Sequence, residues 1–131
     1  MDSSKRRMSH LTVKTEWEYS GPMPHIRFRA LKEDQVCHLS SELSPLLAAA
    51  IQTSEDNFTF EHVATQFFTQ GKIVESYPFV EVLWFARAQE IQDQCAKIIT
   101  DKVKSIANAE DVVVVFSVLD KSAYYENGKH F

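Results

Sequence analysis

The sequence predicts an α+β fold in which two βαβ units in tandem form one four-stranded mixed sheet with both helices on one face. Strand-like and helix-like stretches follow one another as β-α-β and then again as β-α-β. The two halves also resemble each other: Pro24 opens the first and Pro78 the second, and acidic pairs at 55–56 and 110–111 precede the second strand of each. The length of 131 residues suffices for one domain with a core and is too short for two.

The first half begins with a short strand at residues 24–30. A helix should follow, because apolar residues then recur at three-and-four spacing. They are Val36, Leu39, Leu43, Leu46, Leu47 and Ala50. Pro45 lies inside this stripe and is expected to kink the helix or to mark a restart. Residues 57–68 predict a second strand, which could be long. A turn is expected after it, around residues 71–72.

The second half repeats this order. Residues 77–85 are rich in aromatic and β-branched side chains, and residues 111–118 form a last apolar strand. Between them a helical stripe contains Ile91, Cys95, Ile98, Ile99, Val103 and Ile106. Both strands are apolar on two faces, which is typical of strands covered on both sides. Because helices cover only one face, the sequence predicts a closed homo-oligomer that buries the other.

Composition excludes several classes of function. The chain has a net charge of −4, and residues 1–22 contain four basic against three acidic residues, so the body is acidic and a nucleic-acid partner is not expected. A membrane span is not expected, since no apolar run approaches about 18 residues. No secretory signal is evident, and we expect a cytoplasmic protein. Cys37 and Cys95 lie in separate helical stretches, and neither a metal site nor a cofactor-binding loop is suggested.

Three segments together resemble a known group of proteins. They are Pro24-His-Ile-Arg-Phe, the strand at 77–85 followed by Arg87, and the ending at 124–131. These segments resemble the tautomerase superfamily, which includes the macrophage migration inhibitory factor (MIF) type and 4-oxalocrotonate tautomerase, and most specifically the bacterial DUF1904 family. The resemblance covers residues 23–131. It implies the tautomerase/MIF-like fold and a homotrimer whose sheets form a central barrel, with active sites near subunit boundaries.

The resemblance also implies a catalytic role for Pro24, as an N-terminal general base that is exposed when the initiator methionine is removed. Met23 would then be the family's start, and residues 1–22 a flexible extension whose deletion leaves the fold intact. A free α-amine titrates near about 7.7–8.0, and burial lowers its pKa, so it could remove a proton next to a carbonyl. As written, however, the Pro24 nitrogen is a non-basic amide. The alternative is that Pro24 merely begins an edge strand.

Strand directions suggest companions for Pro24. The second-half strands should finish at the sheet end where the first begins, which places Arg87 near Pro24. Its guanidinium could bind a substrate carboxylate or stabilise an enolate. Alternatively, Arg87 is a surface residue that pairs with acidic neighbours such as Glu90. The resemblance nominates Tyr124 and Phe131 of the tail as pocket walls beside Trp84. If the tail is shifted by one residue, Tyr125 instead of Tyr124 would form this pocket wall.

Other polar residues have structural interpretations. Arg27 and Arg29 share a strand face with His25 and should pair across the sheet with Glu81. His62 is expected to be a core histidine with its hydrogen bonds satisfied. The sequence thus favours a tautomerase or isomerase that uses Pro24 on a small carbonyl or carboxylate ligand. The alternative is a non-catalytic trimeric scaffold or a small-ligand binding protein.

Overall fold

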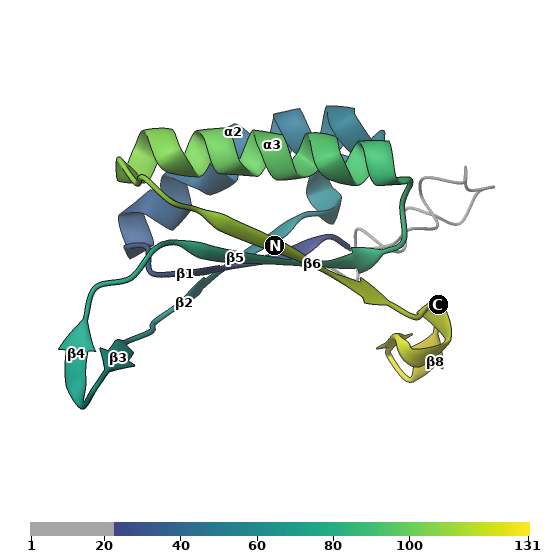
Figure 1. Ribbon diagram of the computed structural model, residues 1–131. Helices are drawn as coiled ribbons and strands as arrows, with labels where there is room; N and C mark the ends of the chain where they lie inside the picture. Colours follow the sequence, from purple (N-terminus) through teal and green to yellow (C-terminus); the bar gives the residue numbers. More distant parts are fainter. Residues whose placement is uncertain (1–22) are drawn as a thin grey trace.

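The computed structural model describes residues 23–131, and two parallel strand pairs form its sheet (Figure 1). The strand order is β2-β1-β5-β6, with bounds Thr59–Val63, His25–Arg29, Phe79–Phe85 and Val113–Leu119. β1 is parallel to β2, β5 is parallel to β6, and β1 and β5 are antiparallel. The predicted tandem βαβ plan and mixed sheet are confirmed. Residues 1–22, and with them the predicted extension, lie outside the described residues.

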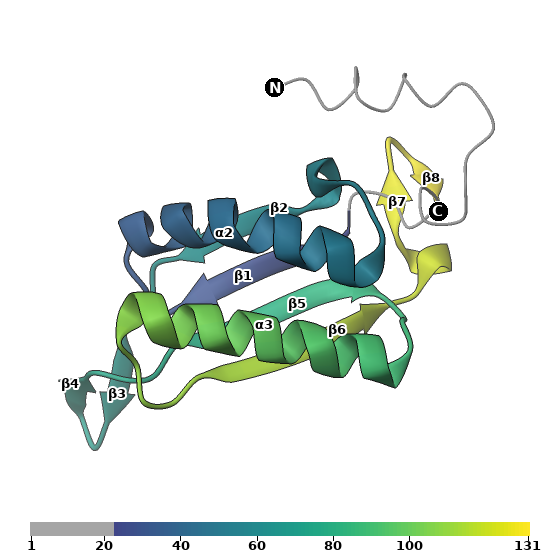
Figure 2. The same ribbon diagram turned by 90° about the horizontal axis from the view of Figure 1, so that it is seen from above.

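Two helices of 19 residues, α2 (Glu33–Ile51) and α3 (Gln89–Ala107), lie side by side on one face of the sheet (Figure 2). Each has one apolar stripe that faces the sheet, and both end in a left-handed residue, Gln52 after α2 and Asn108 after α3. The core consists of these stripes and the inward side chains of β1 and β5. Its fully buried members include Ile26, Phe28, Leu39, Leu43, Val80, Val82, Trp84, Ile99 and Val103.

α2 runs through Pro45 as one helix, so the predicted restart is wrong. Proline removes only one backbone hydrogen bond from the ladder. The apolar stripe continues on both sides of it, with Leu43 and Leu47 buried against the core. Packing of this face therefore holds the helix together across the missing bond.

The predicted second strand is confirmed, but it is shorter than residues 57–68. β2 ends at Val63, and β3 (Phe67–Thr69) and β4 (Lys72–Val74) form a separate two-stranded sheet that projects from the body (Figure 1). The hairpin turn at Gln70 and Gly71 has φ values of 50° and 74°, which suit a two-residue turn. The predicted position of the turn is confirmed, although the strand before it leaves the main sheet.

Within residues 23–131, no helix covers the second face of the sheet, which we call the open face (Figure 1). Alternation places Glu81 of β5 and Ser117 of β6 on it, between apolar neighbours such as Val115. These two strands are therefore apolar on the helix side and mixed on the open side. Within residues 23–131, no helix is long and apolar enough to cross a membrane.

Candidate functional site

One end of the sheet gathers the residues that the sequence nominated. His25 at the start of β1 pairs with Leu83 near the end of β5, and Phe85 at the end of β5 pairs with Leu119 at the end of β6. The C-terminal segment with β7 (Tyr125–Glu126) and β8 (Lys129–His130) lies at the same end (Figure 2). The predicted convergence of the β1 start with the ends of β5 and β6 is confirmed.

Pro24 is buried at this end and directly precedes β1. Its carbonyl accepts a hydrogen bond from the Thr59 backbone N–H at 3.1 Å, which ties it to the start of β2. Its side chain borders a cavity of about 10 Å3 that Phe58, Trp84 and Cys95 also line. That volume matches about one water molecule and is far below the roughly 300 Å3 of a small-molecule pocket. A substrate must therefore approach from outside this cavity.

Trp84 lies on the helix side of β5, in the core, and only 1% of its surface is exposed. Its ring packs on Phe116 with 4.7 Å between ring centroids. The indole N–H has no hydrogen-bond partner although it is buried. Trp84 and Pro24 thus border one cavity, but the ring of Trp84 is a core element and forms no open pocket wall in this chain.

Arg87 follows β5 and is half-buried. Its Cζ lies 5.7 Å from the centroid of the Trp84 ring, and its Nε and Nη2 atoms are buried without a hydrogen-bond partner. Burial lowers the pKa of Arg87, and the nearby Cys95 opposes this shift. Burial also raises the pKa of the Cys95 thiol to about 11, so this neighbour is neutral at physiological pH. Among the described residues 23–131, this positive charge has no counter-charge and lies beside a buried aromatic ring.

The tail aromatics form a second cluster at this end, around Phe85. Tyr124 meets the Phe85 ring edge-on at 5.4 Å, and Phe131 stacks on it at 5.6 Å. Tyr124 and Phe131 also contact each other, at 5.8 Å. Tyr125 is 62% exposed and pairs with His130, so Tyr124 is the residue that packs inward. The structure brings the two nominated tail residues together, on the sheet face opposite Trp84.

Residues 23–130 match the family described as a domain of unknown function, DUF1904. The chain belongs to the DUF1904 family. A search of curated proteins found no match.

Two solved structures resemble this DUF1904 chain over nearly their whole length. A DUF1904 domain from Sebaldella termitidis is 39% identical with a TM-score of 0.78, and the match covers 83% of this chain and all of the other. A protein of unknown function from Vibrio cholerae is 41% identical with a TM-score of 0.79, covering 92% of this chain and 98% of the other.

More distant structures share the fold. A MIF-like protein from Entamoeba histolytica has a TM-score of 0.65 at 17% identity, over 82% of this chain and 98% of its own. A fused wild-type 4-OT asymmetric trimer has a TM-score of 0.71 at 10% identity, over 82% of this chain and 95% of its own. The DUF1904 chain therefore has the tautomerase/MIF-like fold that the sequence predicted.

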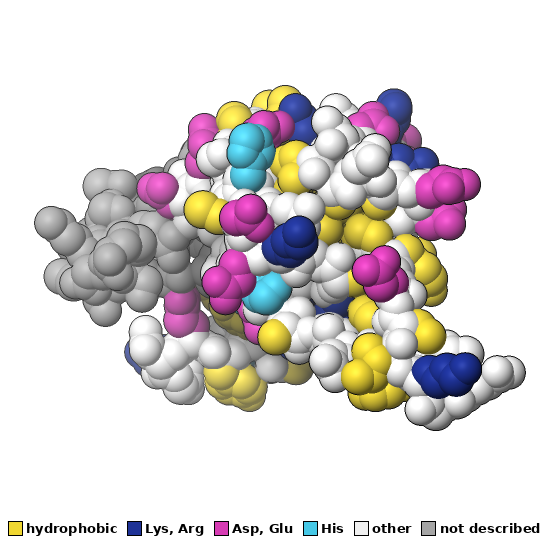
Figure 3. Space-filling model, turned by 90° about the vertical axis from the view of Figure 1, so that its left-hand side faces the viewer, with side chains coloured by type: hydrophobic (Ala, Val, Ile, Leu, Met, Phe, Trp, Pro, Cys, Tyr) yellow, Lys and Arg dark blue, Asp and Glu magenta, His cyan; other side chains and the backbone are white. Residues whose placement is uncertain are grey.

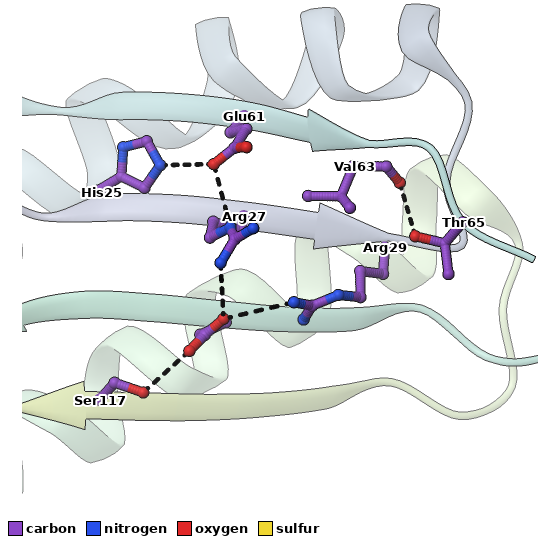
Figure 4. Close-up of polar contacts among 8 residues, drawn as sticks. His25, Arg27, Arg29, Glu61, Val63, Thr65 and Ser117 are labelled. Carbon is purple, nitrogen blue, oxygen red and sulfur yellow. Dashed lines mark hydrogen bonds and ion pairs between the residues drawn. The ribbon is translucent and has the colours of Figure 1, made fainter.

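A ladder of charges crosses the open face of the DUF1904 sheet (Figure 4). Glu61 of β2 lies 2.7 Å from His25 and 3.1 Å from Nε of Arg27, although this N–H is not aligned for a hydrogen bond. Glu81 of β5 lies 3.6 Å from Arg27 and 3.7 Å from Arg29 and accepts a hydrogen bond from Ser117. The predicted Arg–Glu pair across the sheet is confirmed, and Glu81 lies near both arginines. The hydrogen bond with His25 is the main cause that lowers the pKa of Glu61.

The other end of the molecule, which faces the viewer in Figure 3, carries the hairpin that is labelled in Figure 1. A shallow groove of about 810 Å3 separates β3 and β4 from the start of α2 and the end of α3. Phe68 and Ile73 of the hairpin are 64% and 65% exposed. This groove lies at the opposite end of the sheet from Pro24, so it is not part of the candidate site.

Two site residues were missed at the level of sequence. Phe85 holds the tail aromatics, and Cys95 borders the cavity beside Pro24. Alternation along 79–85 could have assigned Phe85 to the open face and Trp84 to the core, but nothing local identifies the packing of the tail. Nε2 of His62 donates a hydrogen bond to the backbone carbonyl oxygen of Leu31 at 2.9 Å, because a carbonyl oxygen only accepts. Within residues 23–131, no group of three potential ligands is placed to hold a metal ion.

Proposed function

We propose that this DUF1904 protein is a tautomerase or isomerase that acts on a small carbonyl acid, with Pro24 as general base when the chain begins there. The observation that carries the proposal is the convergence of Pro24 and Arg87 at one end of a tautomerase/MIF-like sheet. A secondary amine would take a proton from the carbon next to a carbonyl and return it to carbon or oxygen. Burial of Pro24 favours the neutral, basic form of such an amine.

In this proposal, Arg87 binds the carboxylate of the substrate. Its Nε and Nη2 atoms are unpaired and lie on one edge of the guanidinium. That edge can donate two parallel hydrogen bonds to a carboxylate, which is the strongest arrangement for such a pair. The ring of Trp84 below the guanidinium limits its movement. Tyr124 and Phe131 would border the site on the side of the tail.

We propose further that the working form is a homotrimer whose open sheet faces surround a central barrel. The charge ladder and the partly exposed Val115 lie on a face that no helix covers. The water-sized cavity at Pro24 supports this proposal, because additional walls are needed to enclose a substrate.

One observation favours a second candidate function. In the 131-residue chain, Met23 precedes Pro24, so the Pro24 nitrogen is an amide that cannot act as a base. A non-catalytic trimer that binds a small carboxylate at Arg87 would fit this form. Intact-mass measurement on protein from the native host decides between the two, because only a chain that begins at Pro24 supports catalysis.

The pH–rate profile of a chain begun at Met23 tests the proposal, after its methionine has been removed. Tautomerisation of phenylpyruvate should rise with pH as the Pro24 amine loses its proton, with an apparent pKa below about 7.7. Pro24→Ala keeps a primary amine and should slow the reaction without abolishing it. A rate that is flat with pH and unaffected by Pro24→Ala would contradict the role of the proline.

A further inference from the structure

The groove beside the β3–β4 hairpin has an excess of negative charge. Its volume is about 810 Å3, and the exposed residues Glu75, Glu110 and Asp111 line it. Within residues 23–131, none of these three carboxylates forms an ion pair. Among the described residues that line the groove, Lys32 alone is basic. With three acidic residues against one basic residue, the lining has a formal charge of −2.

The two helix ends at the groove do not change this sign. Residues 107–109 at the end of α3 line the groove, and a helix C-terminus carries about half a negative elementary charge, which Lys104 in the last turn offsets. The start of α2 has the opposite partial charge, which Glu33 and Asp34 in its first turn offset. The three carboxylates of the lining therefore decide the sign, and the groove favours a cationic occupant.

Aromatic rings in the groove suit arginine in particular. Phe67 and Tyr77 line it, and 47% of the Tyr77 surface is exposed. A guanidinium can stack on such a ring while it donates hydrogen bonds to carboxylates, and its carbon stem covers apolar surface. The volume of the groove lies within the roughly 300–1,000 Å3 of small-molecule sites, so it has room for more than one long side chain. The groove thus fits a short segment with adjacent basic residues.

The chain has such a segment before residue 23. Residues 5–7 are Lys-Arg-Arg, which we call the basic triplet, and only one of residues 1–10 is acidic. The chain from Pro24 to Ala30, which lines the groove, spans about 23 Å at about 3.3 Å per residue. Residues 8–23 can extend over about 50 Å. The basic triplet can therefore reach the groove of its own chain.

We propose that the basic triplet binds in the groove of its own chain. Its three basic side chains pair with the three carboxylates of the lining, and the Tyr77 ring stacks on one guanidinium. The groove lies at the opposite end of the sheet from Pro24, so this docking goes beyond the proposed function and does not depend on it. Because the contacts are on the surface, deletion of residues 1–22 should still leave the fold intact. The groove is occupied in the 131-residue chain and free in a chain that begins at Met23.

Backbone amide NMR signals of the full chain test this docking. The triple variant carries Lys5→Ser, Arg6→Ser and Arg7→Ser. We expect signals of groove residues such as Gln66 and Ala109 to shift in the triple variant, because the groove has lost its occupant. Raising NaCl from about 0.1 M to about 1 M should move the wild-type signals toward those of the triple variant at the same salt, since the screening length falls from about 10 Å to about 3 Å.

Two further variants make the test selective. Lys14→Ser is the matched control, because it removes a positive charge from the same part of the chain but outside the basic triplet, and it should leave the groove signals in place. Glu110→Gln combined with Asp111→Asn keeps the shape of the groove and removes two of its carboxylates. In that background, loss of the basic triplet should shift the groove signals less than half as far as it does in the wild type.

Three results would overturn the docking. The groove signals could be the same in the wild type and the triple variant, Lys14→Ser could reproduce the shift, or the shift could be undiminished without the two carboxylates. The source of the occupant is tested by refolding 15N-labelled triple variant together with an excess of unlabelled wild-type chain. We expect the labelled groove signals to stay where they are in the triple variant alone. Movement toward the wild-type positions would show that a second copy fills the groove and would contradict docking within one chain.

Discussion

Glu81 lies at the centre of the charge ladder on the open face of the sheet. Its carboxylate lies between Arg27 and Arg29 and accepts the Ser117 hydroxyl, with 22% of its side chain exposed. Two arginines side by side on one strand would repel each other without it. A carboxylate at this position therefore neutralises the centre of the ladder.

Replacing Glu81 tests this role. We expect Glu81→Gln to lower the free energy of unfolding by about 1–3 kcal/mol, because the partly buried Arg29 loses its counter-charge and Arg27 keeps only Glu61. Urea denaturation measures the change. The matched control is Asp101→Asn, which removes the exposed pair with Lys97 on α3 and should cost less than about 0.5 kcal/mol. Equal losses in the two variants would show that the ladder contributes no more than a surface pair.

Glu61 should make stability depend on acid pH. Its native pKa is lowered from 4.5, chiefly by the hydrogen bond with His25, so its contribution is fully present above 4.5 and is lost as pH falls through the native value. We expect Glu61→Gln to lose less stability than the wild type between about pH 6 and about pH 3.5. Urea midpoints across this range measure it. Glu110→Gln, at an exposed loop position, should follow the wild-type curve, and an identical curve for Glu61→Gln would refute the prediction.

Helices and strands could be predicted from the sequence wherever burial of one face makes apolar residues recur at a regular spacing. The stripe from Val36 to Ala50 predicted α2, because most of its apolar residues, such as Leu39 and Leu43, face the sheet, whereas Leu46 does not. The hairpin could not be predicted this way, since a strand that leaves the sheet after Val63 alternates like one that stays in it. The effect of Pro45 was overestimated because local propensity carries no information on the packing that overrides it.

The orientation of α2 gives a prediction at the level of the element. Leu43 is fully buried, whereas Leu46 is 41% exposed on the outer side of the same helix. We expect Leu43→Ala to cost about 2–5 kcal/mol of stability through lost contacts and a cavity. Leu46→Ala should cost less than about 1 kcal/mol. Similar losses on thermal or urea unfolding would mean that the helix packs with a different face inward.

The candidate site was predictable only in part. Strand directions alone predicted that Arg87 lies at the same end of the sheet as Pro24, because parallel and antiparallel pairing fixes which strand ends meet. The position of the tail was not predictable, since Tyr124 and Phe131 are held by Phe85, a contact about 40 residues apart in sequence that no local pattern encodes. The unpaired donors of Trp84 and Arg87 could not be predicted from the sequence, because whether a donor is paired depends on the groups packed around it in the fold.

The whole molecule is proposed to be a trimer because a trimer would bury the open face of the sheet. We expect sedimentation equilibrium to give about three times the chain mass of 15.0 kDa at micromolar concentration. Val115→Lys, opposite Glu81 on the open face, should yield a monomer with an unchanged circular dichroism spectrum. Leu46→Lys, on the outer side of α2, is the control and should remain trimeric. A monomeric wild type, or a trimeric Val115→Lys variant, would contradict the proposed assembly.

In the proposed mechanism, a free amine at Pro24 performs the reaction. The most direct measurement compares the tautomerisation rate of phenylpyruvate by two forms of the same protein, the 131-residue chain and a chain that begins at Pro24. Both contain Arg87, Trp84 and the tail, and they differ at the base in whether the Pro24 nitrogen is an amide or an amine. The account predicts activity in the chain that begins at Pro24 and none above background in the 131-residue chain. Equal rates in the two forms would contradict it.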